Sequence, residues 1–348
     1  MRVSSRLLKW FSRHKRPLPW RKTRDPYRIW VSEIMLQQTQ VNTVVPYYER
    51  WVKNFPTLRR LANAPLARIL KCWEGLGYYS RARNLHRAAK VVTQKFGGRI
   101  PNSREELLRL PGIGRYTAGA IASIAFNKPE PILDGNVKRV LARLFAIKEP
   151  IDTTRGEKRL WEISRALVES EPKSPGDLNQ SLMELGALVC LPENPQCGVC
   201  PLEKICRAHR LEKELDFPIK LRKTRLEKLK TVAAIIWKKG RVLLQKQDPE
   251  SRWGGLWTFP YWIHTNGKSE KDFLQNKMIQ ELGIRTGKLN SRAELQHAFT
   301  KYRVRLRVYE GKARSVRQKL TWVEPGKISG LPLPRPHQRI AEMIQDHA

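Results

Sequence analysis

The feature that most constrains the fold is a short turn at residues 110–118, which read LPGIGRYTA. Pro111 disfavours continuation of a preceding helix, and Gly112 and Gly114 tolerate backbone angles that strain other residues. Small and apolar residues over 116–126 then resume a helical pattern. Two helices joined by so tight a turn aim backbone N–H groups at one spot, where a phosphate binds well. The stretch predicts a helical hairpin, although such a turn can also serve only to join two helices.

Helix-starting signals flank this hairpin on both sides. Ser103, with Glu106 three residues later, matches a capping box at the start of the helix before the hairpin. Asp134 directly precedes residues 135–145, where apolar residues recur at helical spacing. An Asp in this place can be an N-cap and nothing more. It can also be a functional carboxylate at a helix N-terminus, and the pattern leaves both interpretations open.

Charge points to the kind of partner. The 348-residue chain carries 67 Lys and Arg residues against 32 Asp and Glu, a formal net charge of +35. Such an excess exceeds what solubility needs and predicts a polyanionic partner. The basic residues are interleaved with Trp and Tyr, which favours nucleic acid over an anionic membrane, and no apolar run reaches the length of a membrane span.

The length and the pattern along the chain predict a multidomain protein. Residues 1–210 form amphipathic stretches punctuated by Pro, Gly and Asn, as expected of an all-α domain. Residues 211–230 are charged and poorly periodic, which is typical of a linker. Residues 231–348 mix strand and helix patterns, so we expect an α+β domain there.

The expected second domain begins with a β-hairpin. Residues 232–237 and 241–245 are strand-like and flank the turn residues Lys239 and Gly240. Further expected elements are a half-buried strand over 303–308, where apolar residues alternate with arginines, and helices over 270–282 and 336–344.

Two carboxyl groups are candidates for catalysis. Glu33 lies within the apolar stretch 29–36, IWVSEIML. Burial disfavours the charged form of a carboxyl group and raises its pKa, which suits a general acid near neutral pH. Asp134 has the opposite setting, because a helix N-terminus favours the anion. Such a pair suits hydrolysis of a glycosidic bond, whose transition state carries oxocarbenium charge. The alternative is that Glu33 lies on the polar face of an ordinary helix.

Four of the five cysteines, Cys190, Cys197, Cys200 and Cys206, form the pattern C-x6-C-x2-C-x5-C. Four thiolates suit an iron–sulfur cluster or zinc, and this clustering argues against a disulfide framework. We therefore expect a metal centre in a reducing, cytoplasmic compartment, with Cys72 as an ordinary core residue.

A glycine-rich loop at residues 75–83, GLGYYSRAR, combines two aromatic residues with two arginines. Enzymes that flip a base out of a duplex have to fill the gap that the base leaves. Leu76, Tyr78 and Gln38 are candidates for that wedge. An aromatic core turn with a solvated basic edge is the simpler alternative.

Together these motifs resemble the helix-hairpin-helix DNA glycosylase superfamily, and within it the A/G-specific adenine DNA glycosylases of the MutY type. The motifs are LPWR at 18–21, SEIMLQQTQ at 32–40, GLGYY at 75–79, the hairpin, LDGNVKR at 133–139 and the four cysteines. The resemblance implies a six-helix barrel module and a cluster-bearing helical module with the active site between them. It also favours a 4Fe–4S cluster over zinc, because the cysteine spacing matches the cluster loop of these enzymes.

The resemblance implies roles for residues at the matching positions. Glu33 is expected to protonate adenine N7 and Asp134 to stabilise the oxocarbenium ion, while Tyr116 and Asn136 position these groups and the sugar. The remaining matches are expected to contact DNA: Trp20, Arg21 and Gln180 in the adenine pocket, Gln38, Leu76 and Tyr78 at the gap, Gly112 and Gly114 at the phosphate backbone, and Lys138 at the abasic product.

Two positions separate this chain from other branches of the superfamily. Strand-cleaving relatives have a lysine at the position of Tyr116, so we expect a monofunctional glycosylase that leaves an abasic site. Thymine-specific relatives lack the pair Gln37 and Gln38, which favours adenine as the base removed.

The second domain resembles the Nudix-like lesion-reading domain of the same family. Its turn for 8-oxoguanine is expected at Phe299, Thr300 and Lys301, where many relatives read FSH, so that a flexible point charge replaces an imidazole. The Nudix motif itself is degraded, and pyrophosphate hydrolysis is not expected, because a single metal-binding carboxylate remains. The matching residues are Asn276, Lys277, Gln280 and Glu281.

The resemblance as a whole implies an enzyme that flips and excises adenine opposite 8-oxoguanine or guanine and so initiates base excision repair. It is expected to bind double-stranded DNA as a monomer and not to bind membranes. One alternative is a non-catalytic iron–sulfur DNA-binding protein, which would have no need for the two carboxyl groups. The other is a related glycosylase with a different target base.

Overall fold

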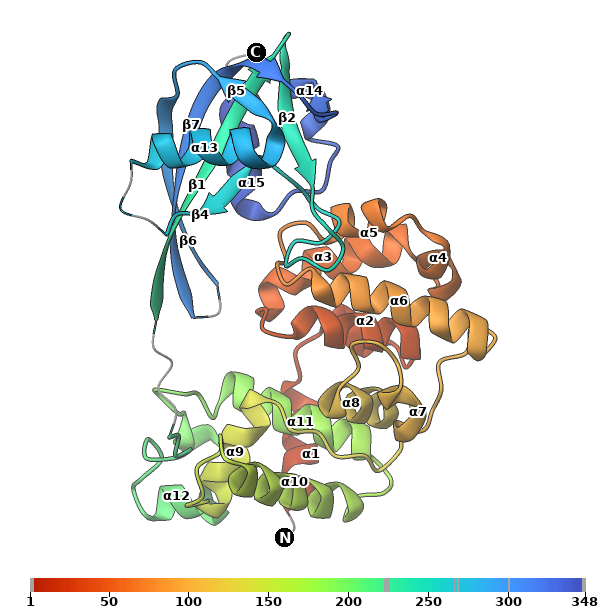
Figure 1. The fold of residues 1–348 in the computed structure, drawn as a ribbon. Helices are drawn as coiled ribbons and strands as arrows, with labels where there is room; N and C mark the ends of the chain where they lie inside the picture. Colours follow the sequence, from red (N-terminus) through yellow and green to blue (C-terminus); the bar gives the residue numbers. More distant parts are fainter. Residues whose placement is uncertain (1–2, 222–225, 266, 268, 300, 346–348) are drawn as a thin grey trace. The chain divides into compact units, whose positions relative to one another are not determined.

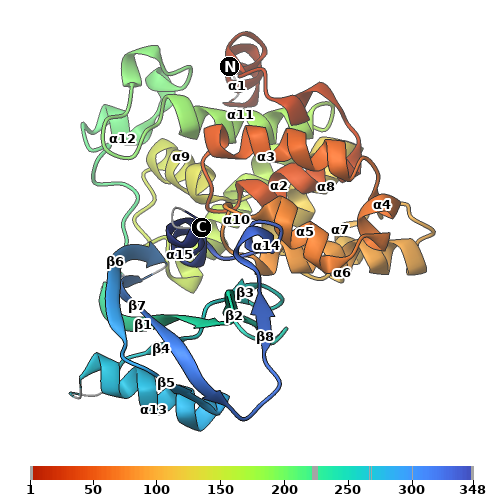
Figure 2. The same cartoon turned by 90° about the horizontal axis from the view of Figure 1, so that it is seen from above.

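The computed structural model describes residues 3–221, 226–265, 267, 269–299 and 301–345, so the expected contact residue Thr300 lies outside the described residues. The chain folds into two compact units (Figures 1 and 2). Unit 1 comprises Met1–Asn63 and Asn84–Lys223, and unit 2 comprises Ala64–Arg83 and Thr224–Ala348. A segment from the N-terminal half thus belongs to the same unit as the C-terminal part, which the sequence did not suggest.

Unit 1 is helical, as the sequence predicted. Several helices begin where a side chain accepts a hydrogen bond from a backbone N–H of the first turn, among them those capped by Asp25, Ser103, Asp134 and Thr153. Its elements are α1 (Val3–His14), η1 (Pro19–Lys22), α2 (Pro26–Leu36), α3 (Val41–Asn54), α4 (Leu58–Asn63), most of α6 (Ser80–Lys95), α7 (Arg104–Leu108), α8 (Arg115–Phe126), α9 (Gly135–Phe145), α10 (Thr154–Glu169), α11 (Pro175–Leu188), η2 (Cys197–Val199), η3 (Glu203–Ile205) and α12 (Arg207–Arg210).

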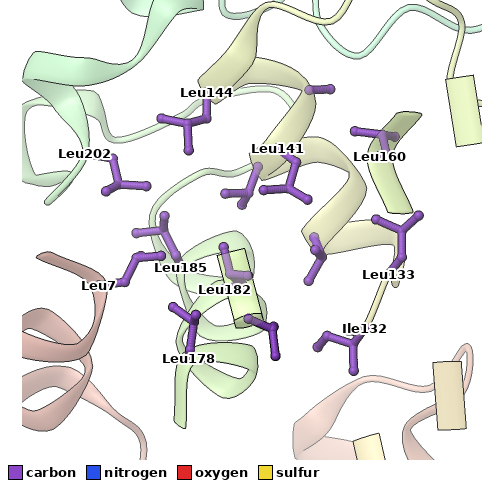
Figure 3. Close-up of a cluster of buried hydrophobic side chains, with 14 of the residues drawn as sticks. Leu7, Ile132, Leu133, Leu141, Leu144, Leu160, Leu178, Leu182, Leu185 and Leu202 are labelled. Atoms are coloured by element: carbon purple, nitrogen blue, oxygen red, sulfur yellow. The ribbon is translucent and has the colours of Figure 1, made fainter. Parts of the chain in front are cut away.

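A leucine-rich core positions the helices of unit 1 that carry the candidate residues. Leu178, Leu182 and Leu185 recur at helical spacing on α11 and are fully buried. Figure 3 shows leucines of α1, α9, α10, α11 and the segment after α11 converging on this core. Burial of each such side chain contributes roughly 1.5–3 kcal/mol. Gly186 lets α9 approach α11 closely, because a Cβ there would lie 2.6 Å from Asn136 Cβ.

Unit 2 is built on a mixed β-sheet with the strand order β3-β2-β1-β7-β5, in which β4 pairs with β1, β6 with β7 and β8 with β2. β1 and β7 run parallel, and β6 and β7 form a long antiparallel hairpin. α13 packs on the sheet face that carries Val232 and Tyr309, and α15 on the opposite face, which carries Ala233 and Val308 (Figure 1). The elements are α5 (Leu66–Trp73), β1 (Glu227–Lys238), β2 (Arg241–Lys246), β3 (Trp257–Thr258), β4 (Tyr261–Ile263), α13 (Glu270–Leu282), β5 (Ile284–Thr286), β6 (Asn290–Phe299), β7 (Tyr302–Val316), β8 (Thr321–Val323), α14 (Pro325–Ile328) and α15 (Arg335–Gln345).

Segment 64–83 is bound to the C-terminal part of unit 2 by polar contacts. Lys71 Nζ donates a hydrogen bond to the carbonyl oxygen of Leu331 at 3.1 Å. Glu74 Oε1 accepts one from the backbone N–H of Leu333 at 2.8 Å. These contacts explain why this segment groups with a sheet that lies far away in the sequence.

The secondary structure expected for the second domain is confirmed. β1 and β2 form the predicted hairpin, in which Lys239 and Gly240 have φ values of 47° and 71°. β1 begins at Glu227, earlier than expected, because its first residues pair with β7 although their side chains are polar. Within the described part of the chain, no helix has the length and apolar character needed to cross a bilayer.

Candidate functional site

Glu33 lies near the end of α2 and is buried, with 4% of its surface exposed, as its apolar neighbours predicted. The phenol of Tyr116, at the start of α8, donates a hydrogen bond to Glu33 Oε2 at 2.6 Å. Burial raises the pKa of Glu33 to about 7. The hydrogen bond from Tyr116 and the charge of Arg21 lower this pKa, whereas the charge of Asp134 raises it further. Glu33 therefore exchanges its proton near neutral pH.

Tyr116 connects three helices at this point. Its hydroxyl oxygen also lies 3.2 Å from Met183 Sδ on α11. Burial, together with the charges of Glu33 and Asp134, raises the pKa of Tyr116 well above its usual value of 10.0. The phenol therefore stays protonated at neutral pH and remains a hydrogen-bond donor to Glu33.

Asp134 is the N-cap of α9, as predicted, and its Oδ1 accepts a hydrogen bond from the backbone N–H of Val137 at 2.7 Å. Its protonation differs from the expectation of a favoured anion. Burial raises the pKa of Asp134 above 3.8, and this effect outweighs the backbone hydrogen bonds and the charge of Arg139, which lower it. The helix N-terminus acts in the expected direction, but desolvation is the larger effect.

The residues that follow Asp134 are held by partners inside unit 1. Asn136 Oδ1 accepts a hydrogen bond from Arg139 Nη2 at 2.8 Å, and the same guanidinium donates to the carbonyl oxygen of Gly186. Lys138 forms an ion pair with Glu157 at 2.9 Å. The side chain of Asn136 is therefore fixed in orientation, whereas Lys138 reaches toward α10.

The predicted helical hairpin is present. Ser103 caps α7 by accepting a hydrogen bond from the Glu106 N–H at 3.2 Å. Gly112 has φ of 79°, and a Cβ there would lie 2.5 Å from Asn84 Cβ, so the turn requires glycine. Gly114 is the exposed N-cap of α8 and its φ is −94°. The backbone N–H groups at this start of α8 are therefore open to solvent or a ligand.

A buried ion-pair cluster that the sequence did not reveal holds Arg21. Glu184 on α11 is 1% exposed and accepts hydrogen bonds from both Arg21 Nη1 and Nη2, at 2.8 and 2.9 Å. Arg16 donates to the same carboxylate through its side chain and its backbone N–H. Although burial opposes ionisation, these hydrogen bonds lower the pKa of Glu184 to about 2. Glu184 thus fixes the guanidinium whose charge acts on Glu33.

The other expected adenine-pocket residues, Trp20 and Gln180, lie on helices of unit 1, and the wedge candidate Gln38 lies in the same unit. Trp20 is buried and packs edge-on against Tyr48, with ring centroids 5.2 Å apart. Gln180 is half-buried, and its Nε2 lies 3.5 Å from Asp177 Oδ1. Gln38 is exposed, directly after α2, and has φ of 55°.

The other two wedge candidates, Leu76 and Tyr78, and the lesion-reading candidates belong to unit 2. Leu76 is buried at 6% exposure, whereas Tyr78 is 43% exposed. Tyr78 and Phe299 both line a cavity of about 790 Å³, and the Arg252 guanidinium lies 3.1 Å from the centroid of the Phe299 ring. Lys301 is exposed and forms an ion pair with Glu227. The cavity therefore brings together two residues that the sequence singled out separately.

The degraded Nudix motif lies on α13. Glu281 accepts hydrogen bonds from Trp262 Nε1 and Lys277 Nζ, both at 2.7 Å. Its carboxylate is therefore engaged by two donors of the same unit.

The four clustered cysteines follow α11. Cys190, Cys200 and Cys206 pack against the core of unit 1, and Cys197 begins η2. Burial raises the pKa of Cys197 to about 11 and that of Cys200 to about 12, and the neighbouring thiols add to both effects. Thiolates gathered in this way need a compensating positive centre.

Arg143 organises this cysteine segment, a role that the sequence did not reveal. It is 2% exposed, and its guanidinium donates hydrogen bonds to the carbonyl oxygens of Leu191, Pro192 and Phe217. Its Nη1 also lies 3.4 Å from Cys190 Sγ. An arginine on an amphipathic helix gives no local signal for such a long-range contact.

Comparisons with known proteins cover both parts of the chain. Residues 31–166 match the HhH-GPD superfamily of base excision DNA repair proteins, and residues 231–343 match the NUDIX domain. The chain is 40% identical over 293 residues to an adenine DNA glycosylase of Buchnera aphidicola subsp. Baizongia pistaciae (strain Bp), covering 84% of this chain and 80% of that protein. It is 49% identical over 218 residues to the adenine DNA glycosylase of Homo sapiens, covering 60% of this chain and 40% of the human protein.

Two solved structures resemble the helical part. A thermostable thymine-DNA glycosylase matches with a TM-score of 0.55 and 32% identity, covering 60% of this chain and 95% of its own. A non-covalent endonuclease III–DNA complex matches with a TM-score of 0.51 and 25% identity, covering 60% of this chain and 94% of its own.

Proposed function

Because the chain belongs to the adenine DNA glycosylase family, we propose that it removes adenine from double-stranded DNA in which adenine faces 8-oxoguanine or guanine. The chain is a DNA N-glycosylase, and its reaction initiates base excision repair. It acts as a monomer in the cytoplasm, and unit 2 supplies the reading of the opposite base.

The observation that carries the proposal is the environment of Glu33. Its pKa of about 7 keeps a substantial fraction protonated at neutral pH, as a general acid requires. The Tyr116 hydroxyl holds one carboxyl oxygen at 2.6 Å and so fixes the direction in which Glu33 presents its proton. A glutamate without a catalytic role is more stable on the solvated face of a helix, because burial makes its charged form unfavourable.

The chemistry follows from the two carboxyl groups. Glu33 gives its proton to N7 of the flipped adenine, which makes the base a neutral leaving group as the bond between N9 and C1′ breaks. The sugar becomes an oxocarbenium ion, and the ionised form of Asp134 stabilises it. Water then adds to C1′ and loses a proton to Glu33, so the products are free adenine and an abasic site. Because Tyr116 offers no amine, no Schiff base forms there and the strand stays intact.

The cysteine segment supplies the donor set of an iron–sulfur cluster, because it places four thiols close together in the sequence. Among the described residues, the three possible ligand atoms that lie within 4.8 Å of one another belong to Cys197, His209 and Glu214, so the four sulfurs do not form such a compact group. A single tetrahedral zinc with Zn–S bonds of about 2.3 Å would bring them to about 3.8 Å. We therefore propose that Cys190, Cys197, Cys200 and Cys206 hold a 4Fe–4S cluster. Its part here is structural, because it supplies the positive centre that these thiolates need.

Recognition of the lesion is proposed for the cavity of unit 2. Tyr78 fills the gap left by the flipped adenine, while Phe299 and Thr300 contact 8-oxoguanine. Lys301 adds phosphate attraction without base preference. Tyr78 suits the wedge better than Leu76, because it is exposed while Leu76 is buried.

The test is single-turnover excision by the wild-type protein and Glu33→Gln on duplexes with A, C or T opposite G and 8-oxoguanine. Each reaction is analysed with and without alkali. We expect wild-type protein to release adenine and to cut the strand only after alkali. Glu33→Gln should bind the same duplex and lose roughly 10²–10⁴-fold or more in rate. A mutant rate within tenfold of wild type would contradict the general-acid role, and release of another base would favour a different glycosylase.

A further inference from the structure

One face of the sheet in unit 2 carries cations on two neighbouring parallel strands. Lys228 and Lys230 of β1 pair in register with Arg303 and Arg305 of β7, and Arg307 follows two residues later on β7. Their apolar neighbours Val304 and Leu306 are buried on the other face. We call these five basic residues, which lie on the face that α13 covers farther along, the cationic face.

This arrangement works against the stability of the sheet. Paired residues on neighbouring strands lie about 4.8 Å apart, and like charges in that position repel. Lys228 faces Arg303, and Lys230 faces Arg305, so two consecutive pairs on this face are cation against cation.

Acidic side chains compensate the two arginines nearest to α13. Glu270, the first residue of α13, accepts hydrogen bonds from Arg305 at 2.8 Å and Arg307 at 3.3 Å. Glu294 of β6 pairs with Arg307 at 2.9 Å. In the described part of the chain, no carboxylate lies within 4.0 Å of the charged groups of Lys228, Lys230 or Arg303, all of which are exposed. Three cations of this face therefore have no ion-pair partner among the described residues.

The surface beside these cations is hollowed. A cavity of about 790 Å³ is lined by Lys228, Lys230, Arg307 and Lys271, together with Glu270. The β6–β7 hairpin continues from the same strands to Phe299 and Tyr302, which pair at its end. A chain of phosphates that follows the hairpin would thus meet basic side chains in succession, in a surface with room for them.

We propose that the cationic face binds the phosphate backbone of duplex DNA. The inference rests on the proposed function only in that DNA is the substrate and that the β6–β7 hairpin lies next to it. Lys228, Lys230 and Arg303 neutralise phosphates without contacting bases, so they contribute affinity that is independent of sequence and lesion. The repulsion between the paired cations is relieved when the phosphates bind.

The experiment compares wild-type protein with Lys228→Gln/Lys230→Gln/Arg303→Gln in binding to an undamaged duplex across a salt series. The matched control is Lys238→Gln/Lys312→Gln/Arg314→Gln, which removes the same charge from the far ends of the same two strands. We expect the variant on the cationic face to reduce the slope of log affinity against log salt by up to about 2.7, or about 0.9 per phosphate contact. The control should change it by much less. Neither variant should alter the preference between 8-oxoguanine and guanine.

A second variant tests the proposal even if the triple variant fails to fold. Gln296 on β6 faces Arg305, and Gln296→Lys adds a cation to the same face, which should steepen the salt slope by about 0.9. Equal slopes for the two triple variants, or no effect of Gln296→Lys, would overturn the proposal. Binding to undamaged DNA requires no excision. The salt slopes can therefore be interpreted even if the proposed glycosylase activity is not found. If the partner of the cationic face were an acidic protein, the triple variant of that face would bind DNA with the same salt slope as wild type.

Discussion

Glu33→Gln should make the protein more stable at alkaline pH while it removes activity. Glu33 is held where its charged form is unfavourable, and burial raises its pKa from 4.5 to about 7. A group whose pKa is higher in the folded state binds a proton more tightly there. Its contribution to stability is therefore complete below pH 4.5 and is lost as the pH rises through 7. Glutamine mimics the protonated acid and does not ionise, so the variant escapes this loss.

The size of the expected difference in stability follows from the pKa of Glu33. A rise from 4.5 to about 7 corresponds to about 3 kcal/mol, because one pKa unit is worth about 1.4 kcal/mol. Little screening by solvent is expected, since 4% of the residue is exposed. At pH 8 the variant should exceed wild type by about 3 kcal/mol in the free energy of unfolding of unit 1, and at pH 4.5 the two should be nearly equal. The midpoint temperature should rise by about 6–12 °C at pH 8.

The assay is denaturant unfolding of both proteins at several pH values between 4.5 and 8, followed by a probe in unit 1. Glu162→Gln is the control, because its carboxylate is half exposed and forms an i,i+3 ion pair with Arg159, which contributes little to stability. We expect that control to stay within about 0.5 kcal/mol of wild type at every pH. A stability difference for Glu33→Gln that is independent of pH, or a loss of stability at pH 8, would refute the account of a destabilised carboxylate.

Four further predictions concern Tyr116, the cysteine segment and the lesion-reading turn. Tyr116→Phe removes a hydrogen bond that lowers the pKa of Glu33, so the alkaline limb of the rate profile should move upward by roughly one pH unit; a shift to lower pH would contradict this arrangement. Protein prepared without oxygen should be brown and hold about four irons per chain, and stoichiometric zinc in their place would disprove the cluster. Thr300→Val should reduce the preference for 8-oxoguanine over guanine, measured as the ratio of excision rates. Lys301→Ala should leave that ratio unchanged and lower the salt slope by less than about 0.9, because Glu227 already neutralises part of the lysine charge.

Local signals in the sequence predicted local structure well. Ser103 and Asp134 cap the helices expected of them, and Gly112 has the positive φ that the hairpin turn needs. The alternation around Val304 and Leu306 gave the correct inner face of β7. These features depend on a few neighbouring residues, whose preferences are visible without knowledge of the fold.

Long-range features were out of reach of the sequence. Arg21 and Glu184 are 163 residues apart, and neither position signals that the other will be its partner. The pKa of Asp134 was predicted in the wrong direction, because the helix N-terminus is visible in the sequence whereas the burial of the carboxyl group, which has the larger effect, is not. The burial and the raised pKa of Glu33 were predicted correctly, because the apolar sequence around it indicated that α2 is buried along most of its length.

The division of the chain between the two units has a mechanical consequence. Because segment 64–83 belongs to unit 2, the backbone passes from one unit to the other at three places, after residues 63, 83 and 223. Any hinge motion of one unit against the other has to bend three covalent connections together, and two of them flank a single short segment. A protease cut between residues 221 and 226 would leave the C-terminal fragment held only by non-covalent contacts with segment 64–83, which stays covalently joined to unit 1 at both ends. Detaching the C-terminal half would therefore also break the hydrogen bonds that Lys71 and Glu74 form with the backbone of Leu331 and Leu333.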